Sequence, residues 1–242
     1  MIRFGKGIVK STLRKFGVDI HKHAPDVSPS AQIAAALRKF EIDLILDVGA
    51  NQGQFASETR ACGYAGNIVS FEPLSAAHAA LLQLSAGDPK WSVHPRCALG
   101  ARNGETEINI AGNSASSSLL PMLDSHIQAA PYAAYIGSEF VTLQTLDSIA
   151  LEHVTKFKNP FLKVDTQGFE WEVLDGAMNV LPHLRGILLE LTLVPLYQGQ
   201  HLWRELISRL EVEGFSLWAL QPGFTDPRDG RTLQADGLFI RL

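Results

Sequence analysis

Short apolar runs alternate with helical segments along most of this chain, and this order restricts the fold more than any other feature. The run IDLILDVG, residues 42–49, is apolar almost throughout and leads directly into a helical stretch, residues 53–63. Continuous apolar strands of this kind suit a parallel sheet that is covered on both faces. We expect further strands of the sheet at residues 66–73, 91–99, 159–165 and 185–193.

The chain ends differently, with strands expected at residues 215–220 and 235–242 and only a loop between them. Such a pair should be antiparallel. Five strand–helix steps followed by this pair predict a doubly wound α/β domain. Ligands of such sheets bind beyond the carboxyl ends of the strands. One crevice should therefore be bordered by residues 47–53, Glu72, 97–99, 165–168 and 190–192.

The N-terminal segment has a charge opposite to that of the rest. Residues 1–23 carry six Lys or Arg and one Asp, a net +5, which leaves −9 for the remainder of a chain whose total is −4. On a helix, Ile2, Val9, Leu13 and Phe16 would share one stripe. We expect a basic amphipathic helix and linker over residues 1–28, which either contacts an anionic membrane surface peripherally or packs on the body.

Residues 29–242 should form a single domain, with an insertion on the rim of the sheet at about residues 103–150. No run of 18 apolar residues occurs, and Cys62 and Cys97 have no metal-binding or disulfide spacing, so a cytoplasmic protein is expected. The acidic body has no basic stripe, which argues against nucleic acid as a partner. The oligomeric state stays open.

The turn after the first strand departs from the dinucleotide fingerprint G-x-G-x-x-G. In that frame the chain has Gly49, Asn51 and Gln54, so two of the three glycines are missing. The second glycine normally lets the backbone approach a pyrophosphate, and a ligand without phosphates removes that demand. A nicotinamide-dependent oxidoreductase is therefore the weaker alternative, although Gly49 and Gly53 could also be simple turn glycines.

Acidic residues at the strand ends point to a cationic nucleoside. Asp47 is expected to face the crevice, where a carboxylate would repel a pyrophosphate and attract a sulfonium group. Glu72 follows Gly53 by 19 residues, which is the spacing of an acidic residue that binds ribose hydroxyls. S-adenosylmethionine satisfies both conditions. The predicted cofactor-binding residues are Asp47, Gly49, Asn51, Gly53, Gln54, Phe55, Glu72, Pro73 and Ala98.

Four motifs, ILDVGANQGQFA, SFEPL, TLDSI and LKVDTQGFEWEVLDGA, resemble the FkbM-type S-adenosylmethionine-dependent methyltransferases. The similarity runs from about residue 40 to the C-terminus. It implies the class I methyltransferase fold, a seven-stranded Rossmann-like sheet of order 3-2-1-4-5-7-6 with an antiparallel last strand. It also implies an O-methyltransferase that acts on hydroxyls of sugars in glycolipids and other glycoconjugates, or of polyketides and other small molecules. Many members carry Glu where this chain has Gln167.

Methyl transfer to a hydroxyl needs a group that takes the proton. Asp165 ends the fourth expected strand, with Lys163 on the same face to tune it; alternatively the two form a structural ion pair and Asp165 caps the next helix. His126, in the rim insertion, is the histidine best placed to be a general base. A fold that has lost catalysis and only binds ligands is a further alternative.

Polar residues around the same edge are candidates for binding the acceptor. Ser117 and Ser118 lie in the loop GNSASSSLL, and Gln167 and Glu190 follow the fourth and fifth expected strands. Asp165 and Glu190 could together hold a divalent metal such as magnesium, although two carboxylates are a small ligand set. Otherwise Glu190 binds a sugar or is simply paired. Weaker candidates for the acceptor site are Asn113, Ser116, Tyr197, Gln198, Gln200 and Asp236.

Overall fold

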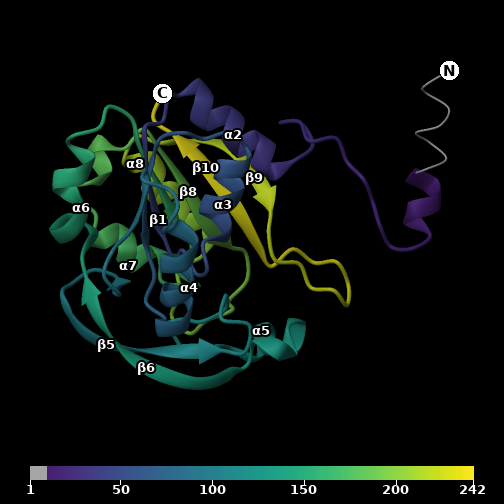
Figure 1. Ribbon diagram of the computed structural model, residues 1–242. Helices are drawn as coiled ribbons and strands as arrows, with labels where there is room; N and C mark the ends of the chain where they lie inside the picture. Colours follow the sequence, from purple (N-terminus) through teal and green to yellow (C-terminus); the bar gives the residue numbers. More distant parts are fainter. Residues whose placement is uncertain (1–9) are drawn as a thin grey trace.

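The computed structural model of the protein describes residues 10–242 (Figure 1). Its centre is a seven-stranded sheet in which only the last strand, β10, runs antiparallel to its neighbours β8 and β9. The expected antiparallel pair at the end of the chain is thus confirmed. The strands of this sheet are β1 (Leu44–Val48), β2 (Asn67–Phe71), β3 (Trp91–Val93), β7 (Pro160–Val164), β8 (Gly186–Thr192), β9 (Ser216–Pro222) and β10 (Gln234–Ile240).

The strand order is β3-β2-β1-β7-β8-β10-β9. These numbers differ from the order implied by the family resemblance because three strands of the chain form a sheet of their own. Counted along the chain within the seven-stranded sheet alone, the same order reads 3-2-1-4-5-7-6. The direction in which successive strands are added to the sheet reverses between β1 and β7. Ligands of doubly wound sheets bind at this switch point.

Helices cover both faces of the sheet, as the apolar strands require. On one face, α6, α7 and α8 pack on Leu46, Leu162 and Leu189. On the other, α2, α3 and α4 pack on Ile45, Phe161 and Leu238. The helices are α2 (Pro29–Lys39), α3 (Gln54–Ala61), α4 (Ser75–Ser85), α6 (Leu146–Val154), α7 (Glu170–Asp175) and α8 (Trp203–Val212).

A second, three-stranded sheet lies at the rim, at the bottom of Figure 1. It consists of β4 (Ala98–Leu99), β5 (Gly104–Ala111) and β6 (Tyr135–Gln144), in the order β4-β6-β5. The short helix α5 (Asp124–Ala129) and the 3₁₀ turn η1 (Pro131–Ala133) lie between β5 and β6, and η2 (Leu181–His183) precedes β8. The predicted rim insertion contains β5, α5, η1 and β6.

The strand expected over residues 91–99 is wrong in its length. It is divided into β3 in the main sheet and β4 in the small one, with an irregular segment around Pro95 between them. A proline has no N–H for the ladder and restricts the residue before it, so it interrupts a strand at this point. The break lets the chain leave the main sheet and reach the rim.

The basic amphipathic helix and linker expected over residues 1–28 lie partly outside the described residues, and Ile2 and Val9 of the apolar stripe lie wholly outside them. Within the described part, helical backbone covers residues 10–14, and Gly17 adopts a left-handed φ of 74° after it. Residues 18–23 are not helical, and the Phe16 side chain is 79% exposed. Figure 1 shows this segment extending away from the sheet. Between residues 10 and 242, no helix is long and apolar enough to span a membrane.

Packing between the rim and α7 predicts a strict requirement for glycine at position 176. A Cβ on Gly176 would overlap the carbonyl oxygen of Gly100, which is backbone and cannot rotate away. We expect Gly176→Ala to lower the free energy of unfolding by about 3 kcal/mol, measured by urea denaturation. Gly87→Ala is the matched control, because its Cβ would meet no atom within 4 Å. Equal stability of the two variants would contradict this packing.

Candidate active site

A cavity of about 630 Å³ opens at the carboxyl ends of β1, β2 and β7. Its size is typical of small-molecule sites. Most of the predicted site residues line it, although Asp47, Gly53, Ser118 and His126 do not. Those that do are Gly49, Asn51, Gln54, Phe55, Glu72, Pro73, Ala98, Ser117, Lys163, Asp165, Gln167 and Glu190.

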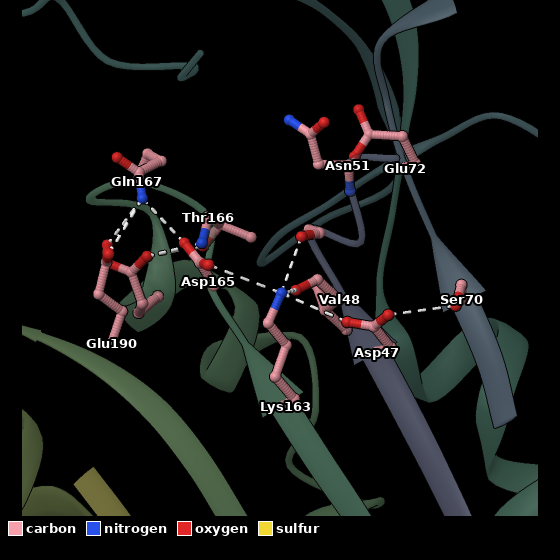
Figure 2. Close-up of polar contacts among 12 residues, drawn as sticks. Asp47, Val48, Asn51, Ser70, Glu72, Lys163, Asp165, Thr166, Gln167 and Glu190 are labelled. Atoms are coloured by element: carbon pink, nitrogen blue, oxygen red, sulfur yellow. Dashed lines mark hydrogen bonds and ion pairs between the residues drawn. The ribbon is translucent and has the colours of Figure 1, made fainter. Parts of the chain in front are cut away.

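Asp47 does not face this cavity, contrary to the expectation from the sequence. Its side chain is completely buried and belongs to a polar row that crosses the sheet below the cavity. Ser70 on β2 and Lys163 on β7 are its partners in register on either side, and Trp91 on β3 donates its indole N–H to the Ser70 hydroxyl at 3.0 Å. Ser70 donates to Asp47 Oδ2 at 3.2 Å (Figure 2).

Lys163 is the cation of this row and the link between the two central turns. Its Nζ lies 3.3 Å from Asp47 Oδ1 and 3.7 Å from Asp165 Oδ2. The first contact is an ion pair without hydrogen-bond geometry, since Oδ1 accepts no hydrogen bond. Burial alone would lower the pKa of Lys163, but the two carboxylates raise it above its ordinary value, so the ammonium stays charged.

The same ammonium also holds the turn after β1. It donates to the carbonyl oxygens of Val48 at 3.2 Å and Gly49 at 2.8 Å (Figure 2). Gly49 has a φ of 71°, and a Cβ there would overlap the carbonyl oxygen of Asp165. The position is therefore closed to any side chain. The two turns, after β1 and after β7, touch through backbone atoms at the switch point.

Asn51 completes the first turn in a left-handed conformation, with a φ of 47°. Asparagine tolerates this region better than most residues. Its backbone N–H donates to Glu72 Oε2 at 2.7 Å, and its side-chain amide donates to the Ser114 hydroxyl at 3.2 Å. Asn51 thus ties the turn to β2 on one side and to the rim loop on the other. Ser114 carried no recognisable signal in the sequence, because its contact spans 63 residues.

Glu72 lines the cavity with a nearly buried carboxylate. Oε1 accepts from the Leu74 N–H at 2.8 Å, while Oε2 accepts from Asn51. Only 3% of the residue is exposed, and burial raises its pKa to about 7, against the effect of the two backbone donors. Each carboxylate oxygen retains a lone pair for a ligand hydroxyl.

In the turn after β7, one amide bridges two acidic side chains. Gln167 Nε2 donates to Asp165 Oδ1 at 2.8 Å and to the two Glu190 oxygens at 3.1 and 3.0 Å (Figure 2). Its Oε1 accepts from the Tyr197 hydroxyl at 2.9 Å. Asp236 faces Glu190 across the β8–β10 ladder. Burial and then the neighbouring Asp165 raise the pKa of Asp236 to about 6.

This arrangement does not resemble a metal site. The amide of Gln167 bridges Asp165 and Glu190, which the sequence suggested as metal ligands. Burial, followed by nearby carboxylates including Asp165, raises the pKa of Glu190 well above its usual value. Residues 10–242 contain no group of three or more His, Cys, Asp or Glu that could hold a metal ion. The residues therefore do not fit a bound divalent metal.

Glu170 shapes this turn from below and was not singled out from the sequence. Its fully buried Oε1 accepts from the Thr166 N–H at 2.8 Å and the Gly168 N–H at 3.2 Å. Gln167 between them has a φ of 55°. Asp165 does not cap α7, whose N-cap is Phe169 without a side-chain hydrogen bond. Asp165 keeps a 40% exposed side chain at the cavity.

Ser118 and His126 do not line the main cavity, although the sequence suggested that they belong to the site. The Ser118 hydroxyl is buried and donates to the Gln167 carbonyl at 2.7 Å, whereas Ser117 accepts from the Ala111 N–H and lines the cavity. His126 is only 2% exposed, and burial lowers its pKa. It lines a smaller, neighbouring cavity instead of the main one, so it is not positioned at the crevice as the expected general base.

The ion pair beneath the cavity predicts strong coupling between Lys163 and Asp47. Lys163→Met leaves a buried carboxylate with no cation, and we expect a loss of about 3 kcal/mol in the free energy of unfolding. Adding Asp47→Asn removes that charge and should restore about 1 kcal/mol or more. Urea denaturation of both single variants and the double variant measures the coupling, with the exposed Lys156→Met as control. Simply additive losses would mean that the pair is not coupled.

A family model described as the methyltransferase FkbM domain matches residues 47–217, more than half of the chain. No curated protein matches. Magnesium protoporphyrin IX methyltransferase from Synechocystis PCC 6803, solved with bound SAM, is 10% identical, with a TM-score of 0.48 over 88% of this chain and 78% of that one.

Fibrillarin from Aeropyrum pernix, solved with S-adenosyl-L-methionine, is 15% identical, with a TM-score of 0.46 over 86% of this chain and 74% of that one. Likenesses this distant bear on neither substrate nor mechanism. The family model does assign the chain, and it spans the turns after β1 and β7 described above. The chain belongs to the FkbM methyltransferase domain family.

Proposed function

We propose that this protein transfers a methyl group from S-adenosylmethionine to a hydroxyl oxygen of a sugar, in a glycolipid or another glycoconjugate. The observation that carries the proposal is that Glu72 and Asp165 line one cavity from the ends of two different strands. One carboxylate suits a ribose of the methyl donor, and the other suits a hydroxyl of the acceptor.

The donor half of the cavity fits a nucleoside without phosphates. Gly49 lines the cavity and packs against the Asp165 carbonyl, so the backbone of the turn forms part of the cavity wall. The apolar side chains of Phe71, Leu74 and Leu99 line the cavity and suit an adenine ring. S-adenosylmethionine, when bound, supplies an electrophilic methyl group on a sulfonium. Glu72 would bind the ribose hydroxyls, and Asn51 would keep the turn in place.

The charge of the cavity argues against a pyrophosphate. Among residues 10–242, Lys163 is the one Lys or Arg that lines it, and Asp47 and Asp165 already neutralise its charge. Five carboxylates line the same cavity, one from α3 and four from the strands or the turns that follow them: Glu58, Glu72, Asp165, Glu190 and Asp236. A ligand with several negative charges would be repelled.

Asp165 is the residue that we assign to the acceptor hydroxyl. Its carboxylate is exposed to the cavity and also has fixed partners. Oδ1 accepts from Gln167, and Oδ2 faces Lys163. Such a carboxylate can accept the proton that the hydroxyl loses as its oxygen is methylated. Lys163 would hold one oxygen of the Asp165 carboxylate, and Gln167 would fix the direction of the other.

Substitution of Asp165 tests the proposed chemistry. Asp165→Asn keeps the size of the side chain but cannot accept the proton, so kcat should fall about 100-fold or more. The assay is transfer of a radioactive methyl group from S-adenosylmethionine to a panel of synthetic alkyl glycosides. Calorimetry should show unchanged binding of S-adenosylhomocysteine. The exposed Asp124→Asn is the control. An unchanged rate for Asp165→Asn would contradict the role of Asp165.

The raised pKa of Glu72 predicts pH-dependent donor binding. With a pKa of about 7, Glu72 is ionised at pH 8 and mostly protonated at pH 6. Hydroxyl donors bind the ionised form better, so the affinity for S-adenosylhomocysteine should be about tenfold weaker at pH 6 than at pH 8. Calorimetry at both pH values measures this. In Glu72→Gln the affinity should be lower and independent of pH over this range; a persisting pH dependence would exclude Glu72 as its source.

A further inference from the structure

A second cavity, of about 200 Å³, adjoins the main one. The two cavities share Ala115, Gln167 and Glu190 among their lining residues. On its other side, the second cavity is lined by His126 of α5 and by Phe224 and Gln234, which flank the loop between β9 and β10. It is therefore a side chamber beyond the amide of Gln167, next to the place where the acceptor would react.

Two buried polar side chains in this chamber lack partners among the described residues. His126 Nδ1 and Gln234 Nε2 accept or donate no hydrogen bond, although the residues are only 2% and 3% exposed. An unsatisfied buried polar group costs about 1–3 kcal/mol, and native proteins keep few of them. Both residues line the chamber, where a polar group of a ligand could satisfy their side chains.

The walls combine rings with neutral polar groups. His126 packs edge-on against Tyr197 at 5.2 Å and lies tilted 5.4 Å from Phe224, measured between ring centroids. No Lys or Arg of the described chain lines the chamber, so an anionic group has no counterion there. Aromatic surface with a few directed amide, imidazole and carboxylate groups suits a compact polyhydroxylated ring.

We propose that the chamber is a subsite for a second sugar ring, the one joined to the sugar that is methylated. The inference rests on the proposed function, and it narrows the acceptor from a sugar to an oligosaccharide of at least two residues. The Gln167 side chain cannot move aside easily, because its amide is hydrogen-bonded to Asp165, Glu190 and Tyr197. The linkage between the two rings would pass Ala115, whose small side chain borders both cavities.

Kinetics with matched acceptors test the subsite. The probes are alkyl monosaccharides and the alkyl disaccharides that contain them, methylated by wild type and by Gln234→Leu. For disaccharides, the loss of one hydrogen bond should raise KM about tenfold with little change in kcat. For monosaccharides, kcat/KM should not change. The exposed Gln83→Leu is the matched control.

A second variant, Phe224→Ala, avoids any change to a buried polar group. Phe224 lines the chamber and not the main cavity, so loss of its ring should weaken the binding of disaccharides while monosaccharides and S-adenosylhomocysteine bind as before. Saturation-transfer NMR should show the second ring of the disaccharide in contact with wild type and not with this variant.

Equal effects of Gln234→Leu and Phe224→Ala on both acceptor lengths, or none on either, would overturn the subsite and leave the proposed function standing. A wild-type protein that methylates neither kind of saccharide, yet methylates another hydroxyl compound, would overturn both the subsite and the sugar acceptor.

Discussion

A buried ammonium group between two carboxylates determines how this active site is built. Lys163 pairs with Asp47 below the cavity and faces Asp165 at its edge, while donating to the backbone of the turn after β1. A lysine buried in a parallel strand is costly unless its charge and its hydrogen bonds are satisfied. Here the charge is paired with two carboxylates and the ammonium donates two hydrogen bonds to backbone carbonyls, which fixes the distance between the turn assigned to the methyl donor and the turn assigned to the acceptor.

The rest of the site follows from this anchor. With its cation neutralised from two sides, the cavity is left with an excess of negative charge, which disfavours phosphates and favours neutral hydroxyl compounds and cations. Gln167 then takes the place that a metal would need, because its amide nitrogen donates to Asp165 and Glu190 together. The neutral amide separates two carboxylates that would otherwise repel each other across the crevice.

The sequence predicted the parts of the fold that depend on local pattern. The continuous apolar strands, the antiparallel final pair and the edge that carries the site were all predicted from periodicity and chain order. The expected strand over residues 91–99 was wrong, because one proline redirects the chain into a second sheet. In the turns, the positions of the residues relative to the strand ends correctly predicted that Gly49, Asn51, Glu72 and Asp165 line one cavity.

Side-chain direction was less predictable. Asp47 was expected to face the ligand and instead pairs with Lys163, because the strand register puts the two side by side below the cavity. Three residues make contacts, or leave a buried donor unpaired, through the tertiary structure, and no spacing rule marks them: Ser114, Glu170 and Gln234. The sequence suggested His126 as a general base because of its imidazole. Its burial between Tyr197 and Phe224 is a property of the tertiary structure.

The central claim is that this switch point holds a nucleoside without phosphates. Isothermal titration calorimetry of the full chain with S-adenosylhomocysteine and, separately, with NAD tests it most directly. We expect saturable binding of S-adenosylhomocysteine with one site per chain and no heat of binding for NAD. Tight binding of NAD with none of S-adenosylhomocysteine would contradict the account of the cavity.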